Sequence, residues 1–198
     1  MTRLITDLRR FDADVRPPRL DDADAAVAYV LEDTPLGRML LARRRSGELL
    51  VSGFAPDDDA EQNWLERLAM TVSPQVLRQP ARLDEVRREL EAYLAGSRTS
   101  FDLPLDLALA TPFQRTVLPA LAARVDYGER TTYGALASAI DRPSAARAVG
   151  AALGANPLCV LLPCHRVLAA SGALTGYAGG LGAKRYLLDL EARTVGQG

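Results

Sequence analysis

The sequence has little of what several classes of protein require. Its 198 residues include only two cysteines and one histidine. No run approaches the roughly 18 consecutive apolar residues that a membrane-spanning helix needs. The first 20 residues lack the apolar stretch of a secretory signal. We therefore expect a cytoplasmic protein without a membrane partner.

The scarcity of cysteine and histidine also limits disulfide and metal chemistry. Cys159 and Cys164 lie close together in a short apolar run, which does not suit a disulfide framework, so at least one free thiol is expected. These two residues and His165 cannot complete the usual four-ligand zinc set without carboxylates. We expect no metal and no other cofactor.

Charge is unevenly distributed along the chain. The net charge of −1 argues weakly against a nucleic-acid partner. However, residues 1–111 carry 15 basic and 20 acidic residues, whereas residues 112–198 carry 9 and 5. The acidic first half is typical of a scaffold, and the basic second half is suited to face phosphates.

The first half predicts an arm followed by a small α/β domain. Residues 1–24, rich in Asp and Arg, have the composition of an N-terminal arm or tail. Short apolar runs with turn signals between them predict an antiparallel meander over residues 26–54. Helical patterns follow at 57–70 and 83–95. We expect a domain over residues 25–100 and a linker over 101–111.

The second half, residues 112–198, predicts a helical DNA-binding domain. A capping box with Pro112 at the first position starts a helix that Pro119 should kink. Apolar residues at helical spacing then predict two helices, over 133–140 and 146–153, joined by a tight turn. This is helix-turn-helix spacing, although adjacent amphipathic helices are common.

The second of these helices has a face of small side chains. Opposite its apolar stripe lie Ala148, Ala151 and Ala152, with Arg147 at the flank. Such a face lets a helix approach a phosphate backbone closely while one arginine reaches into the duplex. The alternative is a helix that is buried on both faces.

A candidate nucleophile follows in the sequence. Residues 158–162 are apolar and predict a buried strand, which ends at Pro163-Cys164-His165-Arg166. A cysteine is nucleophilic as the thiolate, so it needs a base or a positive neighbour. Adjacent side chains on an extended backbone point in opposite directions, so the proton path from Cys164 to His165 would run through a turn or a water.

The segment NPLCVLLPCHRVLAASGALTGYAGGLGAKRYLLDLE (156–191) closely resembles the active-site segment of the O6-alkylguanine-DNA alkyltransferases, also called methylated-DNA-protein-cysteine methyltransferases. The resemblance extends upstream through TPFQRTVLPAL, YGERTTYGALA and RPSAARAVGAALGANP, and more loosely through TPLGRMLLA and TSFDLPLDL. It implies an α+β fold, in which a ribonuclease-H-like sheet-plus-helix domain precedes a winged helix-turn-helix domain that carries the active site.

The resemblance also assigns roles to the acceptor residues. It implies that Cys164 accepts the alkyl group and that His165 takes the thiol proton through a water. Glu191 would orient the histidine, and Asn156 would brace the active-site turn. Without the resemblance, Glu191 would be interpreted as a solvated acid at a helix end and Asn156 as a helix terminator.

The resemblance implies double-stranded DNA containing O6-alkylguanine as partner, with the damaged base flipped out of the stack. Arg147 would replace the extruded base from the minor groove, beside Ala148 and Ala151. Tyr133 would guard the phosphate and help protonate the leaving oxygen.

The Gly-rich segment 176–182 would form the wall of the substrate pocket, with Tyr177 beside the base. Val167 and Cys159 would also line the pocket. Ala178 stands where some family members have a serine, and Cys159 where proline or another apolar residue is frequent.

The implied function is direct-reversal repair with one turnover, since a thioether is not hydrolysed. We expect a monomer in solution; the sequence leaves open whether it binds DNA cooperatively. The alternatives are a non-catalytic protein that recognises alkylated bases, a winged-helix transcriptional regulator, and a thiol protease or redox enzyme. The presence of Cys164 disfavours the first, and the Cys-His pair disfavours the second. The third lacks a recognisable oxyanion hole or Cys-x-x-Cys motif.

Overall fold

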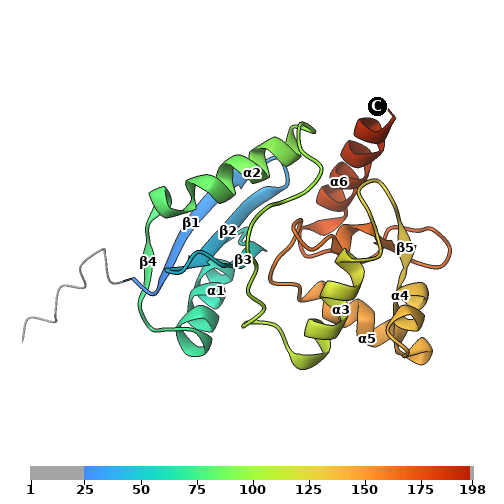
Figure 1. Ribbon diagram of the computed structural model, residues 1–198, viewed down its shortest axis with the longest axis horizontal. Coiled ribbons are helices and arrows are strands. Elements are labelled where there is room, and N and C mark those ends of the chain that lie inside the picture. The colour runs from blue at the N-terminus through green and yellow to red at the C-terminus, as the bar shows by residue number, and fades with distance from the viewer. Residues whose placement is uncertain (1–24, 197–198) are drawn as a thin grey trace, which may run out of the picture.

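The computed structural model describes residues 25–196, and the arm expected over residues 1–24 lies outside them. It has a mixed α+β fold with two lobes along its long axis (Figure 1). The first lobe contains β1 (Val27–Thr34), β2 (Gly37–Arg44), β3 (Leu49–Phe54), α1 (Asp58–Thr71), β4 (Val76–Arg78), η3 (Pro80–Leu83) and α2 (Asp84–Leu94). The second lobe contains α3 (Pro112–Ala122), β5 (Thr131–Thr132), α4 (Tyr133–Ala139), η4 (Pro143–Ala145), α5 (Ala146–Gly154), η5 (Cys164–Arg166), β6 (Val167–Leu168) and α6 (Gly180–Val195).

The first lobe is built on a four-stranded sheet in the order β3-β2-β1-β4. Strands β1, β2 and β3 form the antiparallel meander that the sequence predicts, whereas β4 pairs with β1 in parallel. The predicted helices are confirmed as α1 and α2. Strand β4 was not predicted, because three residues are too short to display an alternating pattern.

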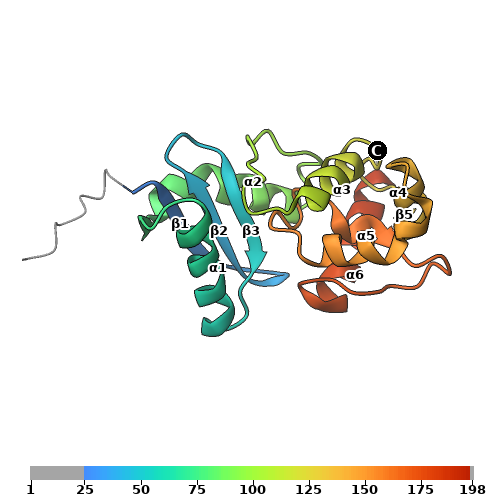
Figure 2. The ribbon, with the colours of Figure 1, turned by 90° about the horizontal axis from the view of Figure 1, so that it is seen from below.

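Both faces of this sheet are buried. Val27 and Leu40 belong to a core cluster with Leu68 of α1, whereas Ala28 belongs to a cluster with Val86 of α2. This follows from the alternation of side chains along a strand. The α2-side cluster continues into the second lobe and includes residues of α3, α5, α6 and the segment 158–164. One core therefore joins the two lobes, which lie end to end in Figure 2.

The second lobe contains the predicted helical pair as α4 and α5. The capping box at the start of α3 is confirmed, with Thr111 and Gln114 bonded reciprocally. Helix α5 exposes Ala148 and Ala151, so it is not buried on both faces. The expectation that Ala152 is also exposed is wrong: it is buried, because it lies three residues after Val149 on the core-facing stripe of α5.

The predicted strand over residues 158–162 is also wrong. Only isolated bridges form there, from Leu158 to Ser52 and from Cys159 to Leu162. Val160 has φ 73°, a left-handed conformation that turns the chain back and is uncommon for a β-branched residue. The apolar run is thus a buried tight loop, and Cys164 begins the turn η5 instead of ending a strand.

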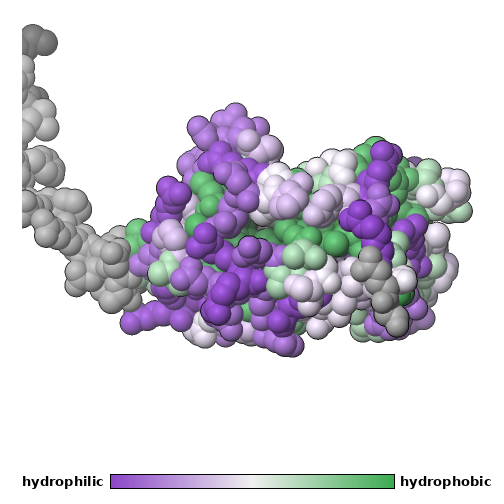
Figure 3. Space-filling model, turned by 90° about the horizontal axis from the view of Figure 1, so that it is seen from above, coloured by the Kyte–Doolittle hydropathy of each residue, from purple (hydrophilic) through white to green (hydrophobic). Residues whose placement is uncertain are grey.

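The surface differs between the lobes. On the face that Figure 3 shows, hydrophilic residues cover most of the first lobe, whereas more apolar surface is gathered over the second. Within residues 25–196, no helix has the length and apolar character needed to span a membrane. In the same residues, no group of three or more His, Cys, Asp or Glu side chains is placed to hold a metal ion.

Candidate active site

The loop between α5 and η5 is held by the side chain of Asn156, which is buried. Its Nδ2 donates to the Leu162 carbonyl at 2.9 Å and to Cys164 Sγ at 3.2 Å, while its Oδ1 accepts from the Leu158 amide at 2.9 Å. One amide therefore ties both ends of the loop together. It also supplies a hydrogen bond that favours a negatively charged sulfur at Cys164.

The two thiols differ in how readily they ionise. Cys164 is 4% exposed. Its pKa is lowered by hydrogen bonding with the Cys159 thiol, and then by the Asn156 amide and the positive charge of Lys184, against the effect of burial. The same thiol pairing and complete burial raise the pKa of Cys159. Cys164 is therefore the thiol that ionises first and the better nucleophile at neutral pH.

His165, the next residue in the chain, is fully buried. Its Nε2 lies 2.6 Å from Glu191 Oε1. An ionised carboxylate can only accept a hydrogen bond, so Nε2 carries the proton and Nδ1 presents a lone pair. Among the described residues, Nδ1 has no hydrogen-bond partner. Burial lowers the pKa of His165, against the effect of Glu191, so the ring is neutral at pH 7 and able to take up a proton.

Glu191 is 1% exposed and lies at the centre of a hydrogen-bond cluster, so the interpretation as a solvated acid is wrong. Its oxygens accept from His165 Nε2, from Arg166 Nε at 3.1 Å, from the Tyr93 hydroxyl and from the Gly128 amide at 3.1 Å. Burial raises its pKa, but His165 and Arg166 outweigh this effect and lower it to about 2. The carboxylate is therefore charged at every pH at which the protein would act.

Three residues of this site were not assigned a role from the sequence: Tyr93, Arg166 and Lys184. Lys184 is fully buried, and its Nζ donates to the carbonyls of Val167 and Thr175 at 2.7 and 2.8 Å. A signal for it exists, since Lys184 lies three and four residues before the buried Leu187 and Leu188 of α6, on the apolar stripe of that helix. Tyr93 had no such signal, because it lies in the other lobe.

A groove of about 740 Å³ opens beside this cluster. Tyr133, Arg147, Tyr177 and Ala178 line it, and the Thr175 hydroxyl donates to the Tyr133 hydroxyl at 3.1 Å. The structure does not place all the expected pocket residues there. Cys159 and Val167 are buried and are not among the groove-lining residues. Ala148 and Ala151, which the sequence predicts to face DNA, lie outside the groove on the exposed side of α5.

The wall of the groove rests on the first lobe. The ring of Phe54, at the end of β3, meets Tyr177 edge to face at 5.5 Å between centroids. Gly179 leaves space for the same ring, since a Cβ on Gly179 would lie 2.3 Å from Phe54. The glycine has φ −85°, which any residue adopts. The space for Phe54, not backbone freedom, therefore favours glycine here.

Gly179→Ala is expected to lower the free energy of unfolding by about 1–3 kcal/mol, because the added methyl overpacks the contact with Phe54. Urea denaturation measures this change. Gly182→Ala is the matched control, because a Cβ there meets open space on α6 and should stabilise the helix by up to about 1 kcal/mol. Equal stability of the two variants would contradict the close contact.

Two family models match the chain. Residues 27–107 match the 6-O-methylguanine DNA methyltransferase, ribonuclease-like domain, and residues 112–193 match the 6-O-methylguanine DNA methyltransferase, DNA binding domain.

Named relatives and solved structures agree with these matches. The methylated-DNA-protein-cysteine methyltransferase of Methanosarcina acetivorans is 40% identical over 165 residues, covering 82% of this chain and 97% of the relative. That of Mycolicibacterium paratuberculosis is 41% identical, covering 84% and 93%. The crystal structure of Mycobacterium tuberculosis O6-methylguanine methyltransferase superposes with a TM-score of 0.71 at 38% identity, covering 85% of this chain and 94% of that one. The chain therefore belongs to the 6-O-methylguanine DNA methyltransferase family.

Proposed function

We propose that this protein is a direct-reversal DNA repair protein that transfers the alkyl group of O6-alkylguanine to Sγ of its own Cys164. The observation that carries the proposal is the buried series Cys164, His165 and Glu191. In it, a thiol of lowered pKa is followed in the chain by a buried imidazole of lowered pKa, and a charged carboxylate holds Nε2 of that imidazole.

The reaction follows from the roles these groups can play. The Cys164 proton passes through a bridging water to His165 Nδ1, and Glu191 stabilises the imidazolium that forms. The thiolate attacks the alkyl carbon as the bond from that carbon to O6 breaks, and guanine O6 takes the bonding electrons and a proton, with Tyr133 as donor. The Tyr133 phenolate then regains a proton and the His165 imidazolium loses one by exchange with solvent, so no net proton is gained or lost. The product is a thioether, which offers no acyl carbon for water, so each chain reacts once.

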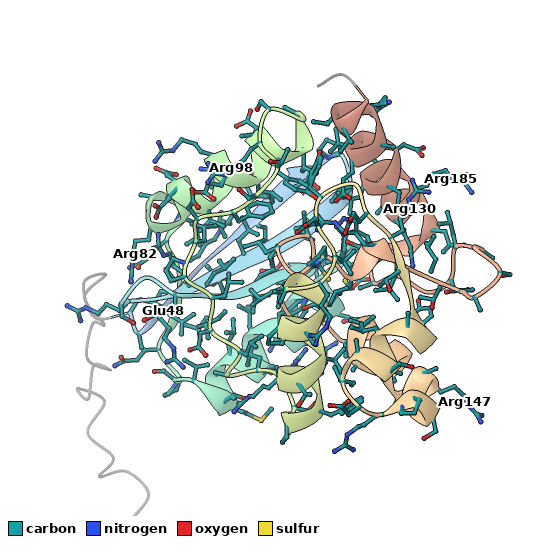
Figure 4. All side chains as sticks on the ribbon, turned by 45° about the vertical axis from the view of Figure 1, so that its right-hand side comes forward. Glu48, Arg82, Arg98, Arg130, Arg147 and Arg185 are labelled. Atoms are coloured by element: carbon teal, nitrogen blue, oxygen red, sulfur yellow. The ribbon has the colours of Figure 1, made fainter. Side chains whose placement is uncertain are left out.

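Recognition of DNA requires the base to leave the stack, because O6 is out of reach inside a duplex. We infer that the flipped guanine enters the groove lined by Tyr133 and Tyr177 while Arg147 of α5 enters the duplex. In Figure 4, Arg147 and Arg185 project outward on the right-hand side of the second lobe, where basic side chains are suited to contact phosphates. A Mycobacterium tuberculosis relative with 37% identity and a TM-score of 0.71 has been crystallised in complex with DNA.

Arg147→Ala is expected to slow repair of O6-methylguanine in duplex DNA much more than reaction with free O6-benzylguanine, which needs no flipping. Single-turnover rates with the two substrates measure this difference. Arg98→Ala, in the first lobe (Figure 4), removes the same charge and should slow neither reaction. Equal slowing of both reactions by Arg147→Ala would mean that Arg147 supports the fold or the pocket, not the duplex step.

The alternative functions predict a different product. A non-catalytic recognition protein or a transcriptional regulator would bind alkylated duplex and keep its mass, and a thiol protease or redox enzyme would not gain a methyl group from DNA. The intact mass after incubation with an O6-methylguanine oligonucleotide therefore separates all of them from the proposed function. We also propose that the protein acts as a cytoplasmic monomer; light scattering of the free protein tests its oligomeric state.

A further inference from the structure

The carboxylate that holds His165 is itself held by a residue of the other lobe. Tyr93, on α2, is 1% exposed, and its hydroxyl donates to Glu191 Oε1 at 2.5 Å. This is the same oxygen that lies 2.6 Å from His165 Nε2. The hydroxyl also accepts from Arg166 Nη2 at 3.4 Å. The hydroxyl oxygen of Tyr93, in the first lobe, thus completes the hydrogen-bond cluster around Glu191 and His165 in the second lobe.

The Tyr93 ring cannot easily move away from this position. It stacks on Phe101 at 4.8 Å between centroids and meets Tyr127 edge to face at 5.6 Å. Burial, and then the charge of Glu191, raise the pKa of Tyr93 far above its ordinary value. The hydroxyl therefore keeps its proton and remains a donor to Glu191 throughout the neutral range.

We propose that Tyr93 is a positioning residue for alkyl transfer: its hydroxyl, supplied by the first lobe, fixes the Glu191 oxygen that holds His165 and limits the basicity of the imidazole. The proposal rests on the proposed function of Cys164 and His165. It assigns the first lobe a part in the chemistry beyond that of a scaffold, because the cluster around the base is incomplete without α2.

The direction of the effect follows from the charges around His165. Glu191 and Lys184 face the ring from α6, Arg166 lies in the same turn, and Tyr177 meets the ring edge to face at 6.4 Å. Of these, only Glu191 favours the imidazolium. The Tyr93 hydroxyl donates to Glu191 Oε1 and competes there with His165 Nε2. Removal of the hydroxyl makes Oε1 a stronger acceptor for Nε2. The pKa of His165 should then rise.

Because His165 is the only histidine in the chain, its titration can be followed without ambiguity in the ¹H NMR spectrum of the untagged, full-length protein. Tyr93→Phe keeps the ring contacts and removes the hydroxyl; Glu191 retains three other donors, so the variant should fold. The expected result is a rise in the pKa of His165 by about 0.5–1 unit. This change is smaller than the full free energy of one hydrogen bond to a charged group, because only part of that energy acts on the protonation of His165. The acidic limb of the pH-rate profile with free O6-benzylguanine should move to higher pH by the same amount.

Tyr127→Phe is the matched control. It removes a buried hydroxyl from the same aromatic cluster, and that hydroxyl has no hydrogen-bond partner among the described residues. Its His165 titration should match that of the original protein. An unchanged or lowered pKa in Tyr93→Phe, or an equal rise in both variants, would overturn the positioning role. Failure of the unsubstituted protein to take up either a benzyl group from O6-benzylguanine or a methyl group from O6-methylguanine DNA would instead overturn the proposed function, and with it the positioning role.

Discussion

With excess duplex DNA containing O6-methylguanine, the protein is expected to gain one methyl group per chain and then stop. The methyl should map to the peptide that contains Cys164, and restored guanine should reach a plateau at one equivalent of protein. The reason is bond chemistry, since a methyl thioether offers neither an acyl carbon for hydrolysis nor a sulfur partner for exchange. Intact-mass spectrometry measures the number of methyl groups gained per chain, and quantification of guanine measures the amount of repaired base per equivalent of protein.

The second thiol provides the control for this prediction. Cys164→Ala should abolish methyl uptake while keeping affinity for alkylated duplex, because the substitution leaves the residues that line the groove, including Arg147, unchanged. Cys159→Ala should still accept one methyl, since burial and its neighbouring thiol raise the pKa of Cys159 and make it the poorer nucleophile. Repair well beyond one equivalent, or a methyl found on Cys159, would contradict the assignment of Cys164.

The elements with regular patterns could be predicted from the sequence. Short apolar runs with turn signals along residues 26–54 and apolar spacing along α4 and α5 specify local geometry, and each predicted element was confirmed within a few residues. The apolar run at 158–162 shows where this reasoning ends. A short apolar segment is compatible with a buried strand or a buried loop. The left-handed turn at Val160 and the bonds to Asn156 decide between them, and both depend on tertiary contacts.

The acceptor site shows the same division. The sequence brings Cys164 and His165 together as neighbours, and the resemblance adds Glu191 and Asn156. The contact of Tyr93 with Glu191 joins positions 98 residues apart in the chain and in different lobes. No local pattern encodes such a pair. Lys184 is a different case: a lysine on the apolar stripe of α6 is a local anomaly, and a buried amine must find acceptors.

Glu191 contributes both to the chemistry of the site and to the stability of the folded protein. Its carboxylate is the only negative charge among the side chains that form the buried cluster with His165, Arg166 and Tyr93. Because its pKa falls from the ordinary 4.5 to about 2, its ionised form stabilises the folded state above about pH 4.5. That contribution, roughly 3 kcal/mol from the size of the shift, is lost as the pH falls toward 2.

Glu191→Gln is therefore expected to lower the free energy of unfolding at pH 7 by about 3–5 kcal/mol, because it leaves the buried Arg166 without its charged partner. Alkyl transfer should slow at least about 100-fold, since a neutral amide cannot stabilise the imidazolium of His165. Asp189→Asn, on the exposed side of the same helix, should change neither value. Urea denaturation between pH 7 and pH 3 tests whether this loss of stability is electrostatic. The difference in the free energy of unfolding between the unsubstituted protein and Glu191→Gln should decrease as the pH falls below 4.5. A difference that stays constant over this range would mean that Glu191 acts through packing and not through its charge.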